Sequence, residues 1–246
     1  MQGSYLGPQF EQADVETRLR ASGAHFEVLA GAELISTAAQ ALAEGAAVGW
    51  FQGRMEFGPR ALGGRSILGD ARSAVMQSIL NLKVKYRESF RPFAPSVLRE
   101  DVAQWFELDI DSPYMLLVAA VAAAHRRTMT AAEQALFGID KLNVPRSSIP
   151  AVTHIDYSAR MQTVHAETNP LYHALISEFK RLTGCPVVVN TSFNIRGEPI
   201  VGTPEDAFRC FMGTEIEYLA VGSCWLRKSA QDAHLQRRYE TRFELD

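Results

Sequence analysis

Three arginines stand among glycines in the stretch GRMEFGPRALGGRSIL. Arg54, Arg60 and Arg65 carry permanent positive charge, and a guanidinium group can bind two anionic oxygens at once. A glycine-rich backbone also lets N–H groups approach a phosphate closely. The stretch therefore predicts a site for an anionic ligand, although an ion pair with Glu56 or Asp70 is an equally good interpretation of any one arginine.

The stretch is not a nucleotide-binding P-loop of the Walker type. That motif needs a lysine followed by Ser or Thr, whereas Gly64 and Arg65 stand in the corresponding region. Contacts to an anion would come instead from arginine side chains and backbone amides. The segment KYRESFRPFAP follows soon after and adds Lys85, Arg87 and Arg91.

Positive charge is concentrated in one part of the chain. Residues 53–99 carry nine Lys or Arg against three acidic residues, a net charge of +6, whereas the whole chain of 246 residues carries −3. The remainder is therefore acidic, which argues against a general nucleic-acid coat. A basic island in an acidic protein favours a compact anionic ligand.

A histidine, an aspartate and an arginine lie close together in the segment THIDYSARMQTV. On a strand, His154 and Asp156 would point to one face and could hold a metal ion or transfer protons, although a structural hydrogen bond is the stronger interpretation. Two ligands do not make a metal site. Arg160 is a further candidate contact for an anion.

Short polar side chains end the apolar run PVVVNTSFN. Asn190, Thr191, Ser192 and Asn194 would stand where a sheet meets a loop, a favourable place to recognise phosphate, ribose or a small amide. Each also fits a turn former or a cap. Covalent catalysis by Ser192 is disfavoured, because no G-x-S-x-G turn surrounds it and no adjacent base can be assigned.

Apolar runs alternate with segments of helical periodicity, which predicts an α/β domain with a mixed sheet. The arginine-rich stretch follows the buried run AAVGWF, and Asp70 is expected to cap the next helix. Strands are expected at 46–51, within RESFRPFAPSVL, and at 114–123, 151–156, 186–194 and 217–226, with helices within 11–44 and at 72–86, 170–184 and 204–213.

Residues 1–246 are interpreted as one domain with a charged segment from about 228 to 246. No apolar run approaches the roughly 20 residues that a membrane helix needs, and the first residues lack a secretory pattern, so a cytoplasmic location is expected. Cys185, Cys210 and Cys224 are widely spaced and indicate neither a disulfide framework nor a zinc site.

Four segments, in this order, resemble the C-terminal domain of the carbamoyltransferase family that includes nodulation-factor and antibiotic O-carbamoyltransferases: GRMEFGPRALGGRSIL, KYRESFRPFAPSVL, HIDYSARMQTV and NTSFNIRGEPIVGTPEDA. The resemblance extends from about Tyr5 to Trp225. It implies a YrdC-like α/β fold, with an open, twisted mixed β-sheet and flanking helices. It also implies that the domain forms carbamoyl adenylate from ATP, with its Mg²⁺, and carbamoyl phosphate.

The resemblance further implies anion contacts at Arg60, Lys85, Arg91, Arg160 and Ser192, with Asn190 and Thr191 beside them. In complete family members, a preceding metal-binding domain of actin-like ATPase type transfers the carbamoyl group to an acceptor hydroxyl. That domain has no counterpart in this sequence, so a separate partner domain or subunit is expected, and a homo-oligomer is compatible with the sequence. With the residues discussed above, we expect Lys85, Arg91 and Arg160 to be catalytic, and Arg60, Arg65, Arg87, His154, Asn190, Thr191, Ser192 and Asn194 to bind nucleotide or substrate, with no protein-bound metal.

Two other functions fit the same residues. A noncatalytic module could retain the fold and bind a nucleotide or another anion. The wider YrdC-like group also includes binders of double-stranded RNA, but the acidic remainder of this chain disfavours an extended RNA surface.

Overall fold

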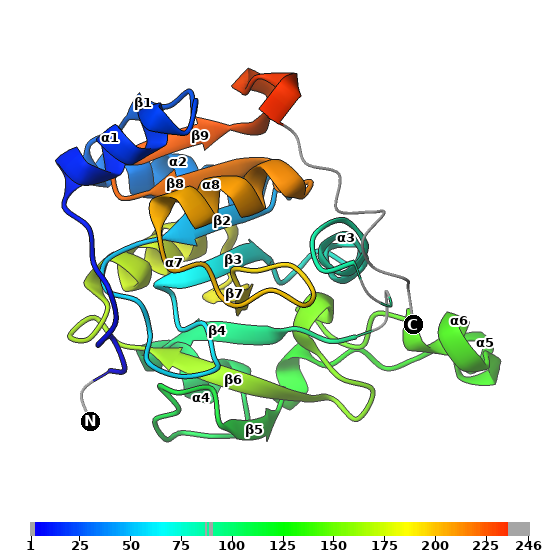
Figure 1. The fold of residues 1–246 in the computed structure, drawn as a ribbon. Helices are drawn as coiled ribbons and strands as arrows, with labels where there is room; N and C mark the ends of the chain where they lie inside the picture. The colour runs from blue at the N-terminus through cyan, green and yellow to red at the C-terminus, as the bar shows by residue number, and fades with distance from the viewer. Residues whose placement is uncertain (1–2, 87, 89–90, 236–246) are drawn as a thin grey trace.

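The computed structural model describes residues 3–86, 88 and 91–235. Within them the chain forms a nine-stranded sheet in the order β1-β9-β8-β2-β3-β7-β4-β6-β5 (Figure 1). β2 pairs parallel with β8, and β4 pairs parallel with β6, while the other neighbours are antiparallel. The strands are β1 (Glu27–Val28), β2 (Val48–Phe51), β3 (Arg65–Asp70), β4 (Ala94–Leu98), β5 (Leu117–Ala120), β6 (Ser158–Val164), β7 (Val187–Ser192), β8 (Tyr218–Val221) and β9 (Cys224–Arg227).

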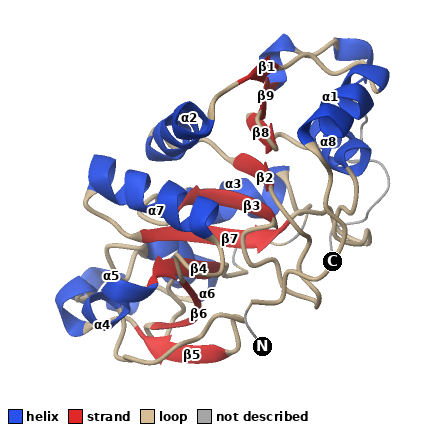
Figure 2. Ribbon diagram, turned by 90° about the vertical axis from the view of Figure 1, so that its left-hand side faces the viewer, coloured by secondary structure: helices blue, strands red, loops and turns tan. Residues whose placement is uncertain are grey.

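Helices cover both faces of this sheet. Figure 2 shows α2 and α7 on one side and α1 and α8 on the other. The short helices α5 and α6 extend beyond the sheet in Figure 1. The helices are α1 (Gln12–Ala21), α2 (Gly31–Ala43), α3 (Met76–Lys83), α4 (Val102–Trp105), α5 (Ala131–Ala135), α6 (Gly138–Leu142), α7 (Pro170–Thr183) and α8 (Pro204–Gly213).

The predicted α/β fold with an open mixed sheet and flanking helices is confirmed. Every residue of β2, β3 and β4 is buried, because helices lie over both faces of the central strands. α7 begins with Pro170 and ends before Gly184, whose φ of +75° is the left-handed conformation that glycine adopts at helix ends. No helix among the described residues is long and apolar enough to cross a membrane.

Three local predictions were wrong. The predicted helix at 72–86 is shorter, since Asp70 ends strand β3 and its carboxylate binds the side chain of Arg72 instead of capping α3. Segment 217–226 is two strands, because a tight turn at Gly222 (φ +54°) folds it into the hairpin of β8 and β9.

The third wrong prediction concerns His154 and Asp156, which lie in a turn before β6 and not on a strand. The Asp156 carboxylate accepts hydrogen bonds from the backbone N–H and the hydroxyl of Ser158, at 3.0 and 2.7 Å. It therefore stabilises the turn and is not paired with the histidine.

Candidate anion-binding site

The arginine-rich stretch is a loop that leaves β2 and returns as β3. Glu56, which is buried, holds this loop together from inside: its Oε1 accepts hydrogen bonds from the backbone N–H groups of Leu62 (2.7 Å), Gly64 (2.6 Å) and Arg65 (3.2 Å). The carboxylate thus takes the place of backbone partners that an irregular loop lacks. Glu56 therefore fixes the path of the chain between Arg60 and β3.

Arg65 also holds the loop and does not face a ligand. Its guanidinium group is fully buried, donates to the backbone carbonyls of Gln52, Gly64, Pro8 and Gly53 at 2.9–3.1 Å, and stacks 3.6 Å from the ring centroid of Phe51. Burial lowers the pKa of Arg65 to about 10. Both terminal nitrogens of Arg65 donate to carbonyl oxygens, and Arg65 does not line the cavity described below, so the structure separates it from the arginines that do.

The start of the described chain braces the same loop. The backbone N–H of Gly7 donates to the carbonyl of Met55 (2.9 Å), and the N–H of Met55 donates to the carbonyl of Pro8 (3.0 Å). The Tyr5 hydroxyl donates to the carbonyl of Leu62 at 2.7 Å. Residues 4–8 therefore run alongside the loop and bond to it at both ends.

One glycine of the loop is required by close packing. Gly63 has a φ of +102°, and a Cβ placed there would lie 2.2 Å from the ring of Tyr172 on α7. No larger residue fits between the loop and that ring. Gly63 thus lets the loop pack directly against α7.

A cavity of about 540 Å³ lies beside this loop, and it collects most of the predicted site residues. They come from four separate segments: the arginine loop, the approach to β4, the start of β6 and the end of β7. None of its described lining residues is Asp or Glu. The lining consists of Pro59, Arg60, Ala61, Arg91, Pro92, Phe93, Ala94, Met115, Val118, His154, Arg160, Asn190, Thr191 and Ser192.

Guanidinium groups dominate the electrostatics of the cavity. Arg60 and Arg160 are each partly buried, and the Nε atom of each is buried without a hydrogen-bond partner among the described residues. Burial first, and the positive charge of Arg60 second, lower the pKa of Arg160. Arg60 and Arg160 repel each other and have no carboxylate partner among the described residues, so the cavity should attract anions strongly.

Two more titratable groups stand at the cavity. Arg91 is half exposed, and its nearest carboxylate is Glu88 at 4.0 Å, too far for a good hydrogen bond. Burial, together with Arg160, lowers the pKa of the His154 imidazole, although Asp156 opposes this shift. The imidazole is therefore mainly neutral at pH 7, and it can donate one hydrogen bond and accept another.

A buried polar network forms the floor behind the cavity. The Asn190 amide nitrogen contacts the carbonyl of Ala61 (3.1 Å), the hydroxyl of Ser96 (3.0 Å) and the Oε1 of Gln162 (2.9 Å). Gln162 in turn donates to the carbonyl of Leu62 at 2.8 Å. The carbonyl of Ala61 can only accept, so it fixes the orientation of the Asn190 amide, whose Oδ1 has no partner among the described residues.

Lys85 lies behind the cavity wall and not in it. Its ammonium group is buried and donates to the carbonyl of Ser192 and to both the carbonyl and Oδ1 of Asn194, the latter two at 2.9 Å. The Ser192 hydroxyl donates to the same Oδ1 at 2.6 Å. Lys85 and Asn194 therefore act together to hold the end of β7, where Ser192 faces the cavity.

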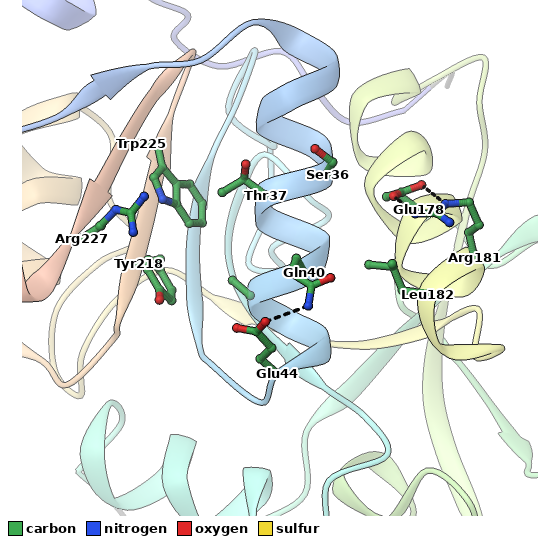
Figure 3. Close-up of a pocket in the computed structure, with 11 residues that line it drawn as sticks. Ser36, Thr37, Gln40, Glu44, Glu178, Arg181, Leu182, Tyr218, Trp225 and Arg227 are labelled. Carbon is green, nitrogen blue, oxygen red and sulfur yellow. Dashed lines mark hydrogen bonds and ion pairs between the residues drawn. The ribbon is translucent and has the colours of Figure 1, made fainter.

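A second hollow, of about 440 Å³, differs in its charge (Figure 3). One face of α2 forms part of its wall, with Trp225 on one side of the helix and Arg181 on the other. Arg181 is paired with Glu178 at 2.7 Å, and Arg227 lies 3.7 Å from Glu27. Since its cations have acidic partners, this hollow offers no comparable attraction for an anion.

The structure thus brings together Arg60, Arg91, Arg160, His154, Asn190, Thr191 and Ser192, places Lys85 and Asn194 directly behind them, and sets Arg65 apart. Arg87 lies outside the described residues. Gln162 was not among the residues predicted from the sequence, although it stands two positions after Arg160 on β6 and so shares its face. Glu56 was predicted only as a partner for arginine side chains.

Comparison with known proteins identifies the family. A model of the carbamoyltransferase C-terminus matches residues 39–228, which include the arginine loop and every residue of the cavity. The chain belongs to this carbamoyltransferase family. The resemblance inferred from the four segments is therefore confirmed.

Relatives of this carbamoyltransferase domain are longer proteins. It is 58% identical, over all of its length, to an uncharacterized protein of Synechocystis, of which it covers 40%. It is 43% identical to the nodulation protein NolO of Bradyrhizobium diazoefficiens (91% of this chain, 38% of the relative), and 38% identical to the 3′-hydroxymethylcephem-O-carbamoyltransferase of Streptomyces clavuligerus (77% and 32%). The chain thus spans about a third to two fifths of these relatives.

One solved structure is also similar to the carbamoyltransferase domain. Full-length HypF, in a phosphate- and nucleotide-bound form, aligns with 71% of this chain and 19% of its own length, with a TM-score of 0.42 and 19% identity.

Proposed function

We propose that this domain activates a carbamoyl group by forming carbamoyl adenylate from carbamoyl phosphate and MgATP. The observation that carries the proposal is the meeting of three guanidinium groups in one cavity whose described lining contains no carboxylate. Carbamoyl phosphate and ATP are both strongly anionic, so joining them requires cations that offset their repulsion. Membership of the carbamoyltransferase family supports the choice of the carbamoyl group.

The reaction balances in two steps. Water cleaves carbamoyl phosphate to carbamate and phosphate. A carbamate oxygen then bonds to the α-phosphorus of ATP while the bond from that phosphorus to the bridging oxygen of the β-phosphate breaks, and pyrophosphate leaves. Negative charge grows on the pyrophosphate as it departs, which is where fixed guanidinium groups stabilise the transition state most.

The geometry suggests a division of labour among the cavity residues. Arg60, Arg91 and Arg160 hold the phosphate groups of the two substrates. Thr191 and Ser192 orient the carbamoyl group by hydrogen bonds. The Oδ1 of Asn190, which has no partner among the described residues, is an acceptor suited to the carbamoyl NH₂. An ionised carboxylate or phosphate oxygen has no proton to donate to it.

Two residues support this arrangement without taking part in the chemistry. Lys85 and Asn194 fix Ser192, as the hydrogen bonds between them indicate. His154 contributes a neutral imidazole to the wall. We further propose that transfer to an acceptor hydroxyl is performed by a partner domain or subunit in the cytoplasm, because the relatives named as carbamoyltransferases are about three times longer than their match to this chain.

Pyrophosphate exchange tests the proposal. The chain is incubated with ATP, carbamoyl phosphate and labelled pyrophosphate, and the appearance of label in ATP is followed. We expect exchange that depends on carbamoyl phosphate and that falls about 10- to 100-fold in Arg160→Met, because a charge-assisted contact is lost in the transition state.

The matched control is Arg181→Met, which removes an exposed arginine of the second hollow and should leave exchange unchanged. Binding of ATP without exchange in the intact chain, with or without the rest of a longer relative, would contradict the proposal and would favour a noncatalytic nucleotide-binding module.

A further inference from the structure

The anion-binding cavity contains one side chain that can act as a neutral base. His154 lines it and is partly buried. The three arginines of the lining stay protonated near neutral pH, and the hydroxyls of Thr191 and Ser192 are far weaker bases than an imidazole. None of the described lining residues is Asp or Glu. His154 is therefore the one described lining group that can take a proton near pH 7.

The ring of His154 has no partner of its own. Neither ring nitrogen forms a hydrogen bond with the described residues. In contrast, a ring nitrogen of His125 lies 3.2 Å from the Ser148 hydroxyl, and one of His173 lies 2.9 Å from the Glu100 carboxylate. Those two histidines have structural partners, whereas the His154 imidazole is available to a ligand.

A short turn fixes where this imidazole stands. The backbone N–H of His154 donates to the carbonyl of Ser158 at 2.8 Å, and the N–H of Tyr157 donates to the carbonyl of His154 at 3.0 Å. Tyr157 has a φ of +65°, a left-handed conformation that residues other than glycine rarely adopt. Because the turn runs directly into β6, it brings His154 to the same cavity as Arg160.

We propose that His154 is the catalytic base of the step in which water cleaves carbamoyl phosphate. This inference rests on the proposed function, which supplies the substrate. A ring nitrogen takes a proton from the water while the water oxygen bonds to the carbonyl carbon, and the bond from that carbon to the phosphate oxygen breaks. The phosphate leaves with the electron pair and receives the proton from His154. The carbamic acid loses its own proton to solvent and becomes carbamate.

The charges around the imidazole keep it in the form that accepts a proton. Burial lowers the pKa of His154, and Arg160 lowers it further, although the Asp156 carboxylate opposes them. Arg60 and Arg91 line the same cavity and add positive charge to it. A base that is mainly unprotonated at neutral pH therefore stands among the cations that would hold the phosphate of the substrate.

Phosphate release tests this step directly. The chain is incubated with carbamoyl phosphate and an ATP analogue that has a methylene group between its α- and β-phosphates, and release is measured against spontaneous decomposition in buffer. His154→Gln should slow release about 100-fold or more, the usual contribution of a general base. The matched control is His125→Gln, which alters a histidine that stacks 3.8 Å from Trp105 outside the cavity lining and should leave release unchanged.

Carbamate from another source separates this step from adenylate formation. Ammonium bicarbonate solutions contain carbamate at equilibrium, so they should support pyrophosphate exchange without carbamoyl phosphate. We expect His154→Gln to lose the exchange that depends on carbamoyl phosphate and to keep the exchange that depends on ammonium bicarbonate. Loss of both would mean that His154 serves the nucleotide or the fold, and retention of both would mean that no base is needed there; either result would overturn the inference.

The pH dependence gives a third readout. Phosphate release by the unaltered chain should fall below pH 6.5, as His154 becomes protonated and can no longer accept a proton. The fall should be absent from His154→Gln, while ionisation of the substrate affects both proteins equally. Identical pH profiles, or an unaltered chain that releases phosphate no faster than buffer does, would defeat the assignment. Release that depends on His154 in a chain without any exchange would preserve it and defeat only adenylate formation.

Discussion

Replacing Arg160 with methionine should make the free protein more stable and its ligand binding weaker. Methionine keeps most of the apolar stem but removes a charge that is partly buried, repelled by Arg60 and without a carboxylate partner among the described residues. Removing such a functional charge typically stabilises a protein by about 1 kcal/mol. For a chain of this size, the melting temperature should rise by about 2–4 °C.

The same substitution removes a charge-assisted hydrogen bond to phosphate. Such bonds contribute about 1.5–3 kcal/mol, so the Kd for ATP should rise about 10- to 100-fold. Thermal unfolding measures the first effect and isothermal titration calorimetry the second. Arg181→Met is the matched control, since that guanidinium is exposed and paired with Glu178, and it should change stability by less than about 0.5 kcal/mol and leave the Kd unchanged.

Opposite signs of the two effects separate a binding residue from a structural one. If Arg160→Met lowered the melting temperature and left ATP affinity intact, Arg160 would belong to the framework, and the electrostatic account of the cavity would be wrong.

Three other substitutions probe the support of the cavity. Lys85→Met should lower the free energy of unfolding by about 2 kcal/mol, because it leaves buried carbonyls at the end of β7 unsatisfied. Urea denaturation measures this change, and an unchanged midpoint would show that Lys85 does not hold the end of β7. Arg65→Lys should also lower the free energy of unfolding by about 2 kcal/mol, since an ammonium cannot reach four carbonyls. The folded variant should bind ATP with an unchanged Kd in calorimetry. A large loss of affinity would mean that Arg65 contacts the ligand. His154→Gln should make the melting temperature fall less steeply below pH 6.5. Burial lowers the pKa of His154 in the folded protein, so its contribution to stability is fully present above pH 6.5 and is lost as the pH falls through that lowered pKa. Melting temperatures of the two proteins that change in parallel with pH would contradict this.

The sequence predicted elements well where a single period dominates. α7 has an N-terminal proline, a C-terminal glycine and one apolar face, and β7 is a continuous apolar run, so both were found within a residue or two. It failed where tertiary contacts decide. The hairpin of β8 and β9 depends on a turn at Gly222, and an apolar run of that length fits one strand equally well.

The candidate site shows the same division. Residue type alone selected the arginines, but it could not tell Arg60 from Arg65, which stand five positions apart and carry the same charge. The difference is made by Phe51 and by carbonyl groups of four other residues, which surround Arg65 only after folding. Likewise, Gln162 becomes part of the site only because folding brings β6 beside the arginine loop, where the Gln162 side chain donates to the carbonyl of Leu62.

The bracing of the arginine loop by residues 4–8 makes the loop sensitive to what is attached ahead of it. Backbone hydrogen bonds at Gly7 and Met55, and the Tyr5 hydroxyl on Leu62, join this segment to the loop that carries Arg60. A polypeptide attached ahead of Ser4 would therefore join this chain within a few residues of the contacts that hold the arginine loop.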